Sequence, residues 1–281
     1  MDVPAVPTIA QALPLRRHYR LVSVTMLPKS VDCDMPRRRD RIGSLIADNF
    51  EPRRVKLGSG NPERVSNPFW HFKIAHALAQ KGLIPKEQAD GARAAWKTAN
   101  RNKSISDSVV HPLWSFDRFG QTATALPDGR ILFVGGEHDD WYDPDFFIYN
   151  DVVVLHPDKL MEIFCYPESI FPPTDFHSAT LVGSNLILIG SIGYPGQRRY
   201  GRTQVMRLDT DSFRISKMEP RGDGPGWIHK HTCEKYGENS VRVSGGEVLS
   251  LAQGREHRIS RVRNSATFVL DLTTLTWSTI S

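Results

Sequence analysis

The chain has 281 residues, of which 40% are apolar and 24% are charged, ordinary values for a folded protein with one large or two modest domains. No stretch approaches the roughly 18 apolar residues of a membrane span, and the three cysteines lie too far apart for a disulfide framework or a zinc-type spacing. At the N-terminus the positive charge follows the apolar residues, which argues against a secretory signal, so we expect a cytoplasmic protein.

Residues 1–66 hold the whole positive excess of the chain. They contain 12 Lys and Arg against 7 Asp and Glu, while the full sequence holds 36 against 31. We predict a basic, partly irregular leader with one possible strand that starts at Tyr19. Basic runs can bind nucleic acid or an anionic surface. Acidic residues interrupt these runs and no series of aromatic residues accompanies them, so we favour a solvated leader over nucleic-acid binding.

Residues 67–103 carry the signals of a helix hairpin. Asn67 and Pro68 suit an N-cap and a first helical position, and Trp70 and Ile74 then follow at helical spacing. Gly82 suits the end of this helix, and a second helical pattern follows it. We expect the hairpin to pack its aromatic face against the rest of the protein. A hairpin that binds a partner is the alternative.

Three copies of one β-pattern follow, beginning at Phe119, Asp175 and His229. Their second strands end at Gly135, Gly190 and Gly245, which lie 55 residues apart each time. Each copy contains four short β-branched or aromatic runs separated by Gly, Pro, Asn and Asp. We therefore predict a mainly β repeat domain over residues 111–281, with units at 119–174, 175–228 and 229–281. The segment "PLWSF", residues 112–116, reads as the outer strand of a preceding unit.

These units resemble the kelch repeat. The sequence has an S-A-T start at 178–180, glycine pairs at 135–136 and 245–246, N-D-V at 150–152, and a fourth-strand tryptophan, Trp277. The resemblance implies a kelch-like β-propeller in which each unit is a four-stranded blade. Propellers carry about four to eight blades, and only three units are recognisable. The ring is then left open, completed by the N-terminal region, or completed by a second copy in a homo-oligomer.

Long loops between the second and third strands are predicted to share one face with the connections between units. The first loop is acidic and aromatic, and the other two are rich in arginine. Loops that vary on a rigid scaffold often carry binding function, and the kelch resemblance also implies a binding platform. Our leading hypothesis is a module that binds a protein partner, without catalysis or a cofactor. The predicted contact residues are Trp141, Tyr142, Phe146, Arg198, Arg199, Arg202 and Arg258. Alternatively, the acidic and basic loops simply pair with one another.

Histidines and carboxylates on the same predicted face support a second hypothesis, a metal-dependent or acid–base enzyme acting on a small polar or sugar-like substrate. Imidazole and carboxylate groups can ligate one divalent transition metal or exchange protons. The catalytic candidates are His138, Asp175, His177, His229 and His231, and the candidate metal ligands are Glu137, His138, Asp139 and His177. His177 and His231 occupy nearly equivalent positions in two units, and a histidine that donates to a loop carbonyl is the structural alternative.

Overall fold

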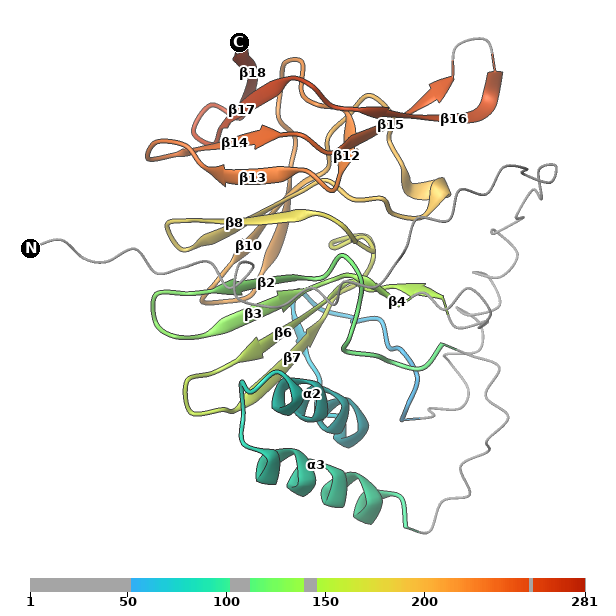
Figure 1. Cartoon of the computed structure of the whole chain (residues 1–281), viewed down its shortest axis with the longest axis vertical. Helices are drawn as coiled ribbons and strands as arrows, with labels where there is room; N and C mark the ends of the chain where they lie inside the picture. The colour runs from blue at the N-terminus through green and yellow to red at the C-terminus, as the bar shows by residue number, and fades with distance from the viewer. Residues whose placement is uncertain (1–51, 102–111, 139–145, 253–254, 281) are drawn as a thin grey trace, which may run out of the picture. The chain divides into compact units, whose positions relative to one another are not determined.

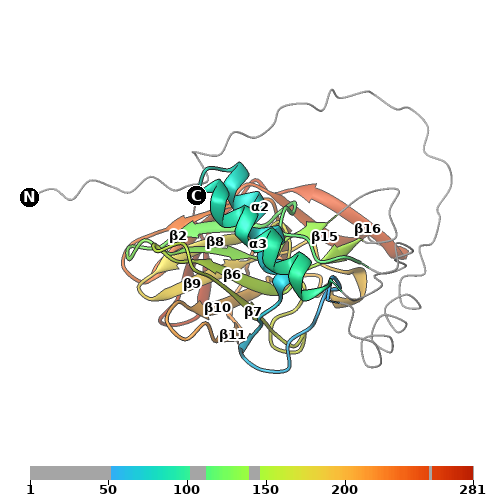
Figure 2. The ribbon, with the colours of Figure 1, turned by 90° about the horizontal axis from the view of Figure 1, so that it is seen from below.

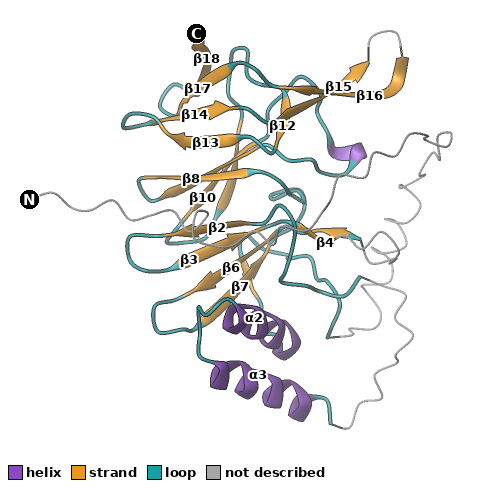
Figure 3. Cartoon of the chain, in the orientation of Figure 1, coloured by secondary structure: helices purple, strands orange, loops and turns teal. Residues whose placement is uncertain are grey.

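The computed structural model describes residues 52–101, 112–138, 146–252 and 255–280, with the side chains of residues 252–258 outside the description. These residues form a mainly β structure with five antiparallel sheets and two α-helices (Figures 1 and 3). They belong to one compact unit that begins at Pro52, earlier than the expected end of the leader at residue 66. The possible strand at Tyr19 lies outside the described residues. None of the described helices is long and apolar enough to cross a bilayer.

Each of the three repeats forms a four-stranded antiparallel meander, as the sequence predicts. In the first meander the strands are β2 (Thr122–Ala125), β3 (Ile131–Val134), β6 (Asp151–Leu155) and β7 (Met161–Cys165). In the second they are β8 (Ser178–Val182), β9 (Asn185–Ile189), β10 (Val205–Asp209) and β11 (Ile215–Met218). In the third they are β13 (Thr232–Lys235), β14 (Ser240–Ser244), β17 (Thr267–Asp271) and β18 (Thr276–Ile280). The described sheets do not close into a ring.

The second meander packs against apolar side chains on both of its faces. Successive side chains of a strand point to opposite sides of the sheet, so neighbouring residues of one strand enter different cores. Leu186 and Leu188 of β9 pack in a core shared with the first meander. Ile187 and Ile189 pack in a second core, shared with the third meander. A strand buried on both faces needs a continuous apolar run, which is what the sequence of β9 provides. The three sheets therefore stack, with one core on each side of the middle sheet.

A helix hairpin covers the remaining face of the first meander, with α2 at Pro68–Gln80 and α3 at Lys86–Ala99. The Asn67 side chain accepts hydrogen bonds from the backbone N–H groups of Phe69, at 2.9 Å, and Trp70, at 3.3 Å, and so caps α2. The buried face of α2 packs in one core with Phe133 and Val153 of the first sheet. Figure 2 shows the two helices lying side by side along this end of the stack. The predicted hairpin and its packing role are confirmed.

The segment that precedes the first meander is not the strand that we expected at residues 112–116. Only a single bridge forms there, between Leu113 and Arg54. The segment is held instead by Trp114, whose ring stacks on that of Trp70 with centroids 4.8 Å apart and planes 8° from parallel. The stacking explains why this apolar, aromatic segment resembles a strand in sequence: it contributes to the core under α2 without joining a sheet.

A buried ion pair between Arg118 and Asp151 fixes the start of the first meander. Nη2 of Arg118 donates to Oδ2 of Asp151 at 2.9 Å, and Nε donates to the carbonyl of Ser115 at 2.6 Å. Asp151 also accepts from the Trp114 indole at 2.8 Å. The guanidinium carbon lies 3.4 Å from the centre of the Tyr149 ring. Because both charges are buried, removing one partner would leave the other uncompensated.

A backbone ladder joins the three meanders just before their first strands. Gly120, Phe176 and Lys230 occupy equivalent positions, and all have left-handed backbones with φ of 61°, 48° and 55°. The Phe176 N–H donates to the Gly120 carbonyl at 3.0 Å, and the Lys230 N–H donates to the Phe176 carbonyl at 2.9 Å. A side chain at Gly120 would place its Cβ 2.4 Å from the Phe176 nitrogen, so glycine is required there.

The outer face of the third meander is mostly polar, unlike the faces of the other two. Glu234 and Arg242 lie opposite one another on β13 and β14 and form an ion pair at 2.6 Å. The neighbouring positions on this face, Ser244 and Thr267, are also polar and only partly buried. Apolar side chains of the same strands, such as Val241 and Val243, point into the core on the other side. The stack therefore has helices at one end and a mostly polar, partly exposed sheet face at the other.

The remaining strands extend the loop side. β1 (Glu63–Arg64) pairs with β7, so part of the expected leader is an edge strand of the first sheet. Two of the predicted long loops contain strands. A short hairpin is formed by β4 (Glu137–His138) and β5 (Phe147–Ile148). A three-stranded sheet is formed by β12 (Trp227–His229), β15 (Glu247–Ala252) and β16 (Arg255–Arg263).

We predict that Asp151→Asn lowers the free energy of unfolding by about 3–5 kcal/mol, because it leaves the buried Arg118 guanidinium without its counter-ion. Urea denaturation measures this loss. The control is Asp128→Asn, which breaks a half-exposed pair with Arg130 and should cost no more than about 1 kcal/mol. Equal, small losses for both variants would contradict the structural role of the Arg118–Asp151 pair.

Candidate binding site on the loop face

The loop that connects β9 to β10 is fixed at its start by a buried carboxylate. Asp175 Oδ1 accepts hydrogen bonds from the Ser191 hydroxyl at 2.8 Å and from the Gly193 N–H at 2.7 Å. The indole of Trp227 donates to the adjacent Ile192 carbonyl at 3.0 Å. Asp175, proposed from sequence as a catalytic candidate, thus fixes the backbone at residues 191–193, where the loop begins. The arginine-rich part of the loop follows these residues.

The first arginine of this loop completes the same anchor. Arg198 donates from Nε to the Ile192 carbonyl at 2.9 Å and from Nη2 to the Gly193 carbonyl at 3.0 Å. These bonds curl the loop around the short 3-10 helix η2 (Pro195–Gln197). The guanidinium of Arg198 is therefore engaged within its own loop, whereas Arg199 and Arg202 follow on the outside of the curl.

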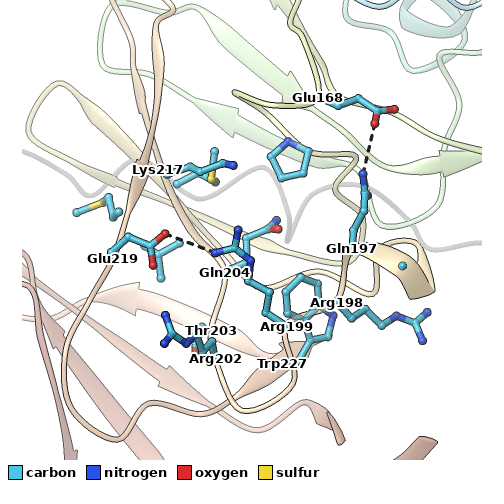
Figure 4. Close-up of a pocket in the computed structure, with 15 residues that line it drawn as sticks. Glu168, Gln197, Arg198, Arg199, Arg202, Thr203, Gln204, Lys217, Glu219 and Trp227 are labelled. Atoms are coloured by element: carbon cyan, nitrogen blue, oxygen red, sulfur yellow. Dashed lines mark hydrogen bonds and ion pairs between the residues drawn. The ribbon is translucent and has the colours of Figure 1, made fainter. Parts of the chain in front are cut away.

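A pocket of about 320 Å³ opens between this loop and the ends of β10 and β11 (Figure 4). Its apolar lining comes from Val205, Met206, Met218, Pro172 and Trp227. Its polar lining includes Arg199, Arg202, Lys217, Glu168 and Glu219. Glu168 and Pro172 belong to the connection between the first two meanders. The pocket thus joins an inter-unit connection to a loop between second and third strands, which confirms the predicted sharing of one face.

The charges around the pocket are only weakly compensated. Arg199 lies 3.7 Å from Glu219, but the two side chains are 62% and 65% exposed, so water screens their attraction. Neither Arg202 nor Lys217 forms an ion pair with another residue in the described part of the chain. An apolar floor with cationic groups at its rim can accept a ligand that carries an anionic group beside an apolar one.

The acidic, aromatic loop lies next to the arginine-rich loop. Phe146 packs edge-on against Tyr194, with ring centroids 6.0 Å apart. The Ile148 N–H donates to the Tyr194 hydroxyl at 2.9 Å. The structure therefore places Phe146 against Tyr194, in the loop that also carries Arg198, Arg199 and Arg202, but Phe146 is not among the residues that line the pocket. Trp141, Tyr142 and Asp139 lie outside the described residues, as does the side chain of Arg258.

Two of the candidate catalytic histidines bridge neighbouring meanders. His177 Nε2 lies 3.0 Å from the Thr122 hydroxyl, and His231 Nε2 lies 2.8 Å from the Ser178 hydroxyl. The equivalent position in the first meander, immediately before Thr122, is Gln121. The histidine partners are therefore hydroxyl groups of the preceding unit, not loop carbonyls as the structural alternative supposed.

Burial keeps these histidines neutral. Burial lowers the pKa of His177 from 6.5 to about 3, with a smaller effect from His231. It also lowers the pKa of His231 to about 4. Burial, followed by the positive charge of Arg261, lowers the pKa of His229 to about 4.

Among the described residues, no three His, Cys, Asp or Glu side chains gather as a group that could hold a metal ion. Glu137 and His138 lie on β4.

Sequence reasoning missed the pocket residues that come from strands and connections, namely Glu168, Pro172, Met206, Lys217, Met218, Glu219 and Trp227. Lys217 lies on β11 and is exposed, although it is two residues after the buried Ile215 and therefore on the same side of the strand. Glu219 follows the end of β11 and is also exposed. Their charge, not the alternation along the strand, could have indicated their exposure. Nothing in the sequence indicates that the 196–204 loop folds back beside them.

No protein-family model and no curated protein matches the chain.

We predict that His177→Gln reduces the sensitivity of the fold to acid. The pKa of His177 is depressed in the folded state, so its contribution to stability is complete above about pH 6.5 and is lost as the pH falls towards about 3, by up to about 1.4 kcal/mol per pH unit. Glutamine is the residue that already serves at the equivalent position of the first meander. Urea denaturation between pH 7 and pH 5, values within the titration window, should show a shallower loss of stability for the variant.

The control for this prediction is His76→Gln, at an exposed position of α2. An unchanged pH slope for His177→Gln, equal to that of the His76 variant, would show that His177 titrates normally in the folded protein.

Proposed function

We propose that this protein is a kelch-like interaction module that binds a protein partner through its loop face. The observation that carries the proposal is the pocket of about 320 Å³ beside the 196–204 loop, with its apolar floor and its uncompensated Arg202 and Lys217. The anchoring of the loop by Asp175, Arg198 and Trp227 supports a preformed site, because no large rearrangement is needed to present the rim.

The repeated features support the kelch-like part of the proposal. Each unit is a four-stranded meander with the chain entering through an equivalent left-handed residue, and equivalent histidines bond the preceding unit in two places. The helical cover at one end and the polar face at the other favour an open stack of three blades over a ring completed by a second copy. A second copy would have to bury the Glu234–Arg242 pair on that face.

The chemistry of the pocket indicates the kind of partner segment. Met206, Met218 and Trp227 offer adaptable apolar contacts, and arginine at a rim can form paired hydrogen bonds to a carboxylate. The segment is expected to carry an acidic side chain next to an apolar one. The histidine–carboxylate face offers no comparable support for a metal-dependent or acid–base enzyme, since Nε2 of His177 and Nε2 of His231 are each engaged by a hydroxyl group of the preceding unit.

The test is selection of binding peptides from a random library displayed on phage, followed by titration of the selected peptide into the protein. We predict enrichment of acidic residues adjacent to apolar ones. The double substitution Arg202→Gln with Lys217→Gln should weaken binding by about tenfold or more, since each lost charge-assisted hydrogen bond is worth about 1.5–3 kcal/mol.

The matched control is Arg214→Gln, an exposed arginine of the same meander at the turn between β10 and β11. It should bind like the unmodified protein, and all variants should keep its melting temperature. Absence of enrichment, or equal affinity for the pocket variant and the control, would contradict the proposed site.

A further inference from the structure

We propose that the outer edge of β16 pairs with an extended acidic segment of a partner protein, an inference that rests on the proposed protein-binding function. β16 spans nine residues and is the last strand in the order β12–β15–β16. Among the described residues, none pairs with its outer edge. An edge of this length presents a row of N–H and C=O groups, which an added strand can satisfy.

The register identifies the groups that point outward. Just beyond β16, the Asn264 N–H donates to the Gly246 carbonyl at 2.9 Å. Hydrogen-bonded and non-hydrogen-bonded pairs alternate along antiparallel strands, and β16 is in regular register with β15 from Ile259 onward. Val262 and Ser260 therefore direct their N–H groups towards β15. Those of Ile259, Arg261 and Arg263 are directed away from it.

Charge selects the occupant of this edge. The β16 sequence contains four arginines and one glutamate. Glu247, the acidic group nearest to Arg261, lies 3.6 Å from it, and both are partly exposed, so the pair is weak. A second copy of β16 would bring arginines close to arginines, and like charges on paired strands are destabilising. An acidic segment instead places carboxylates opposite Arg261 and Arg263.

Apolar side chains refine the expected segment. Ile259 is 41% exposed and lies opposite Leu251, which is 48% exposed, on the same face as Arg261. Val262 is 56% exposed on the other face. A complementary antiparallel strand would place glutamates opposite Arg263 and Arg261, and apolar residues opposite Val262 and Ile259. The segment Glu-Val-Glu-Thr-Val satisfies this order, with threonine opposite Ser260.

The experiment titrates a capped peptide containing Glu-Val-Glu-Thr-Val into the full chain and follows amide hydrogen exchange. We expect binding that slows exchange of the Ile259, Arg261 and Arg263 amides. The same peptide with lysine in place of glutamate should not bind. N-methylation of the central glutamate removes the peptide N–H that would donate to the Arg261 carbonyl, without altering the protein, and should weaken binding by about tenfold or more.

Paired variants separate the backbone from the charge. Arg261→Pro removes the charge together with the outward N–H, which an edge strand tolerates, whereas Arg261→Gln removes the charge alone. Affinity should be about tenfold lower for the proline variant than for the glutamine variant, provided that their melting temperatures agree. Where the proline variant fails to fold, the N-methylated peptide gives the same comparison.

Three outcomes would overturn the inference: no binding of the acidic peptide, binding without slowed exchange on β16, or slowed exchange that depends on protein concentration alone and so reports a second copy. The peptide should also bind normally to the Arg202→Gln, Lys217→Gln protein. Loss of peptide binding in that variant would assign the peptide to the pocket, which sinks the strand-addition inference and leaves the proposed function standing. Failure of the library selection alone would contradict the pocket as the binding site but not the pairing at β16.

Discussion

The first two meanders depend on one constraint, that their sheets are apolar on both faces and must be covered on both sides. The middle sheet is covered by its neighbours, through Leu188 on one face and Ile189 on the other. The first sheet has a neighbour on one side only, and α2 with Trp70 and Ile74 covers the other. Because burial of apolar surface is the main stabilising contribution, the helix hairpin is an integral part of the repeat stack.

This arrangement leaves one end of the strands available for recognition. The tight turns between first and second strands lie at the opposite end of the sheets from the long loops (Figure 1). Asp175, Arg198 and Trp227 fix the start of the 192–204 loop. Arg202 and Lys217 carry the proposed contacts. Arg202 comes from the anchored loop and Lys217 from β11, so the sheets position both residues of the pocket rim. Binding strength then depends on the side chains of the rim more than on the fold beneath them.

The strand plan of the repeats was predictable because period, turn residues and apolar runs agree at every level. The sequence also indicates that the third meander is the last sheet of the stack. β9 is a continuous apolar run, whereas β14 alternates apolar Val241 and Val243 with polar Arg242. This alternation matches the structure, in which only one face of β14 is buried. Long-range contacts were not predictable. The Trp70–Trp114 stack and the Arg118–Asp151 pair join residues 44 and 33 positions apart, and no local pattern specifies them. The pocket likewise depends on a loop that folds beside β11.

Hydrogen–deuterium exchange of the full chain, with and without the peptide recovered by library selection, tests the central claim most directly. The account predicts slowed exchange over residues 196–204 and at the end of β11, where the pocket lies. Exchange in the turns at the other end of the sheets, such as the β10–β11 turn at residues 210–214, should not change. Protection confined to those turns, or to α2 and α3, would contradict the assignment of the loop face as the surface that binds a partner.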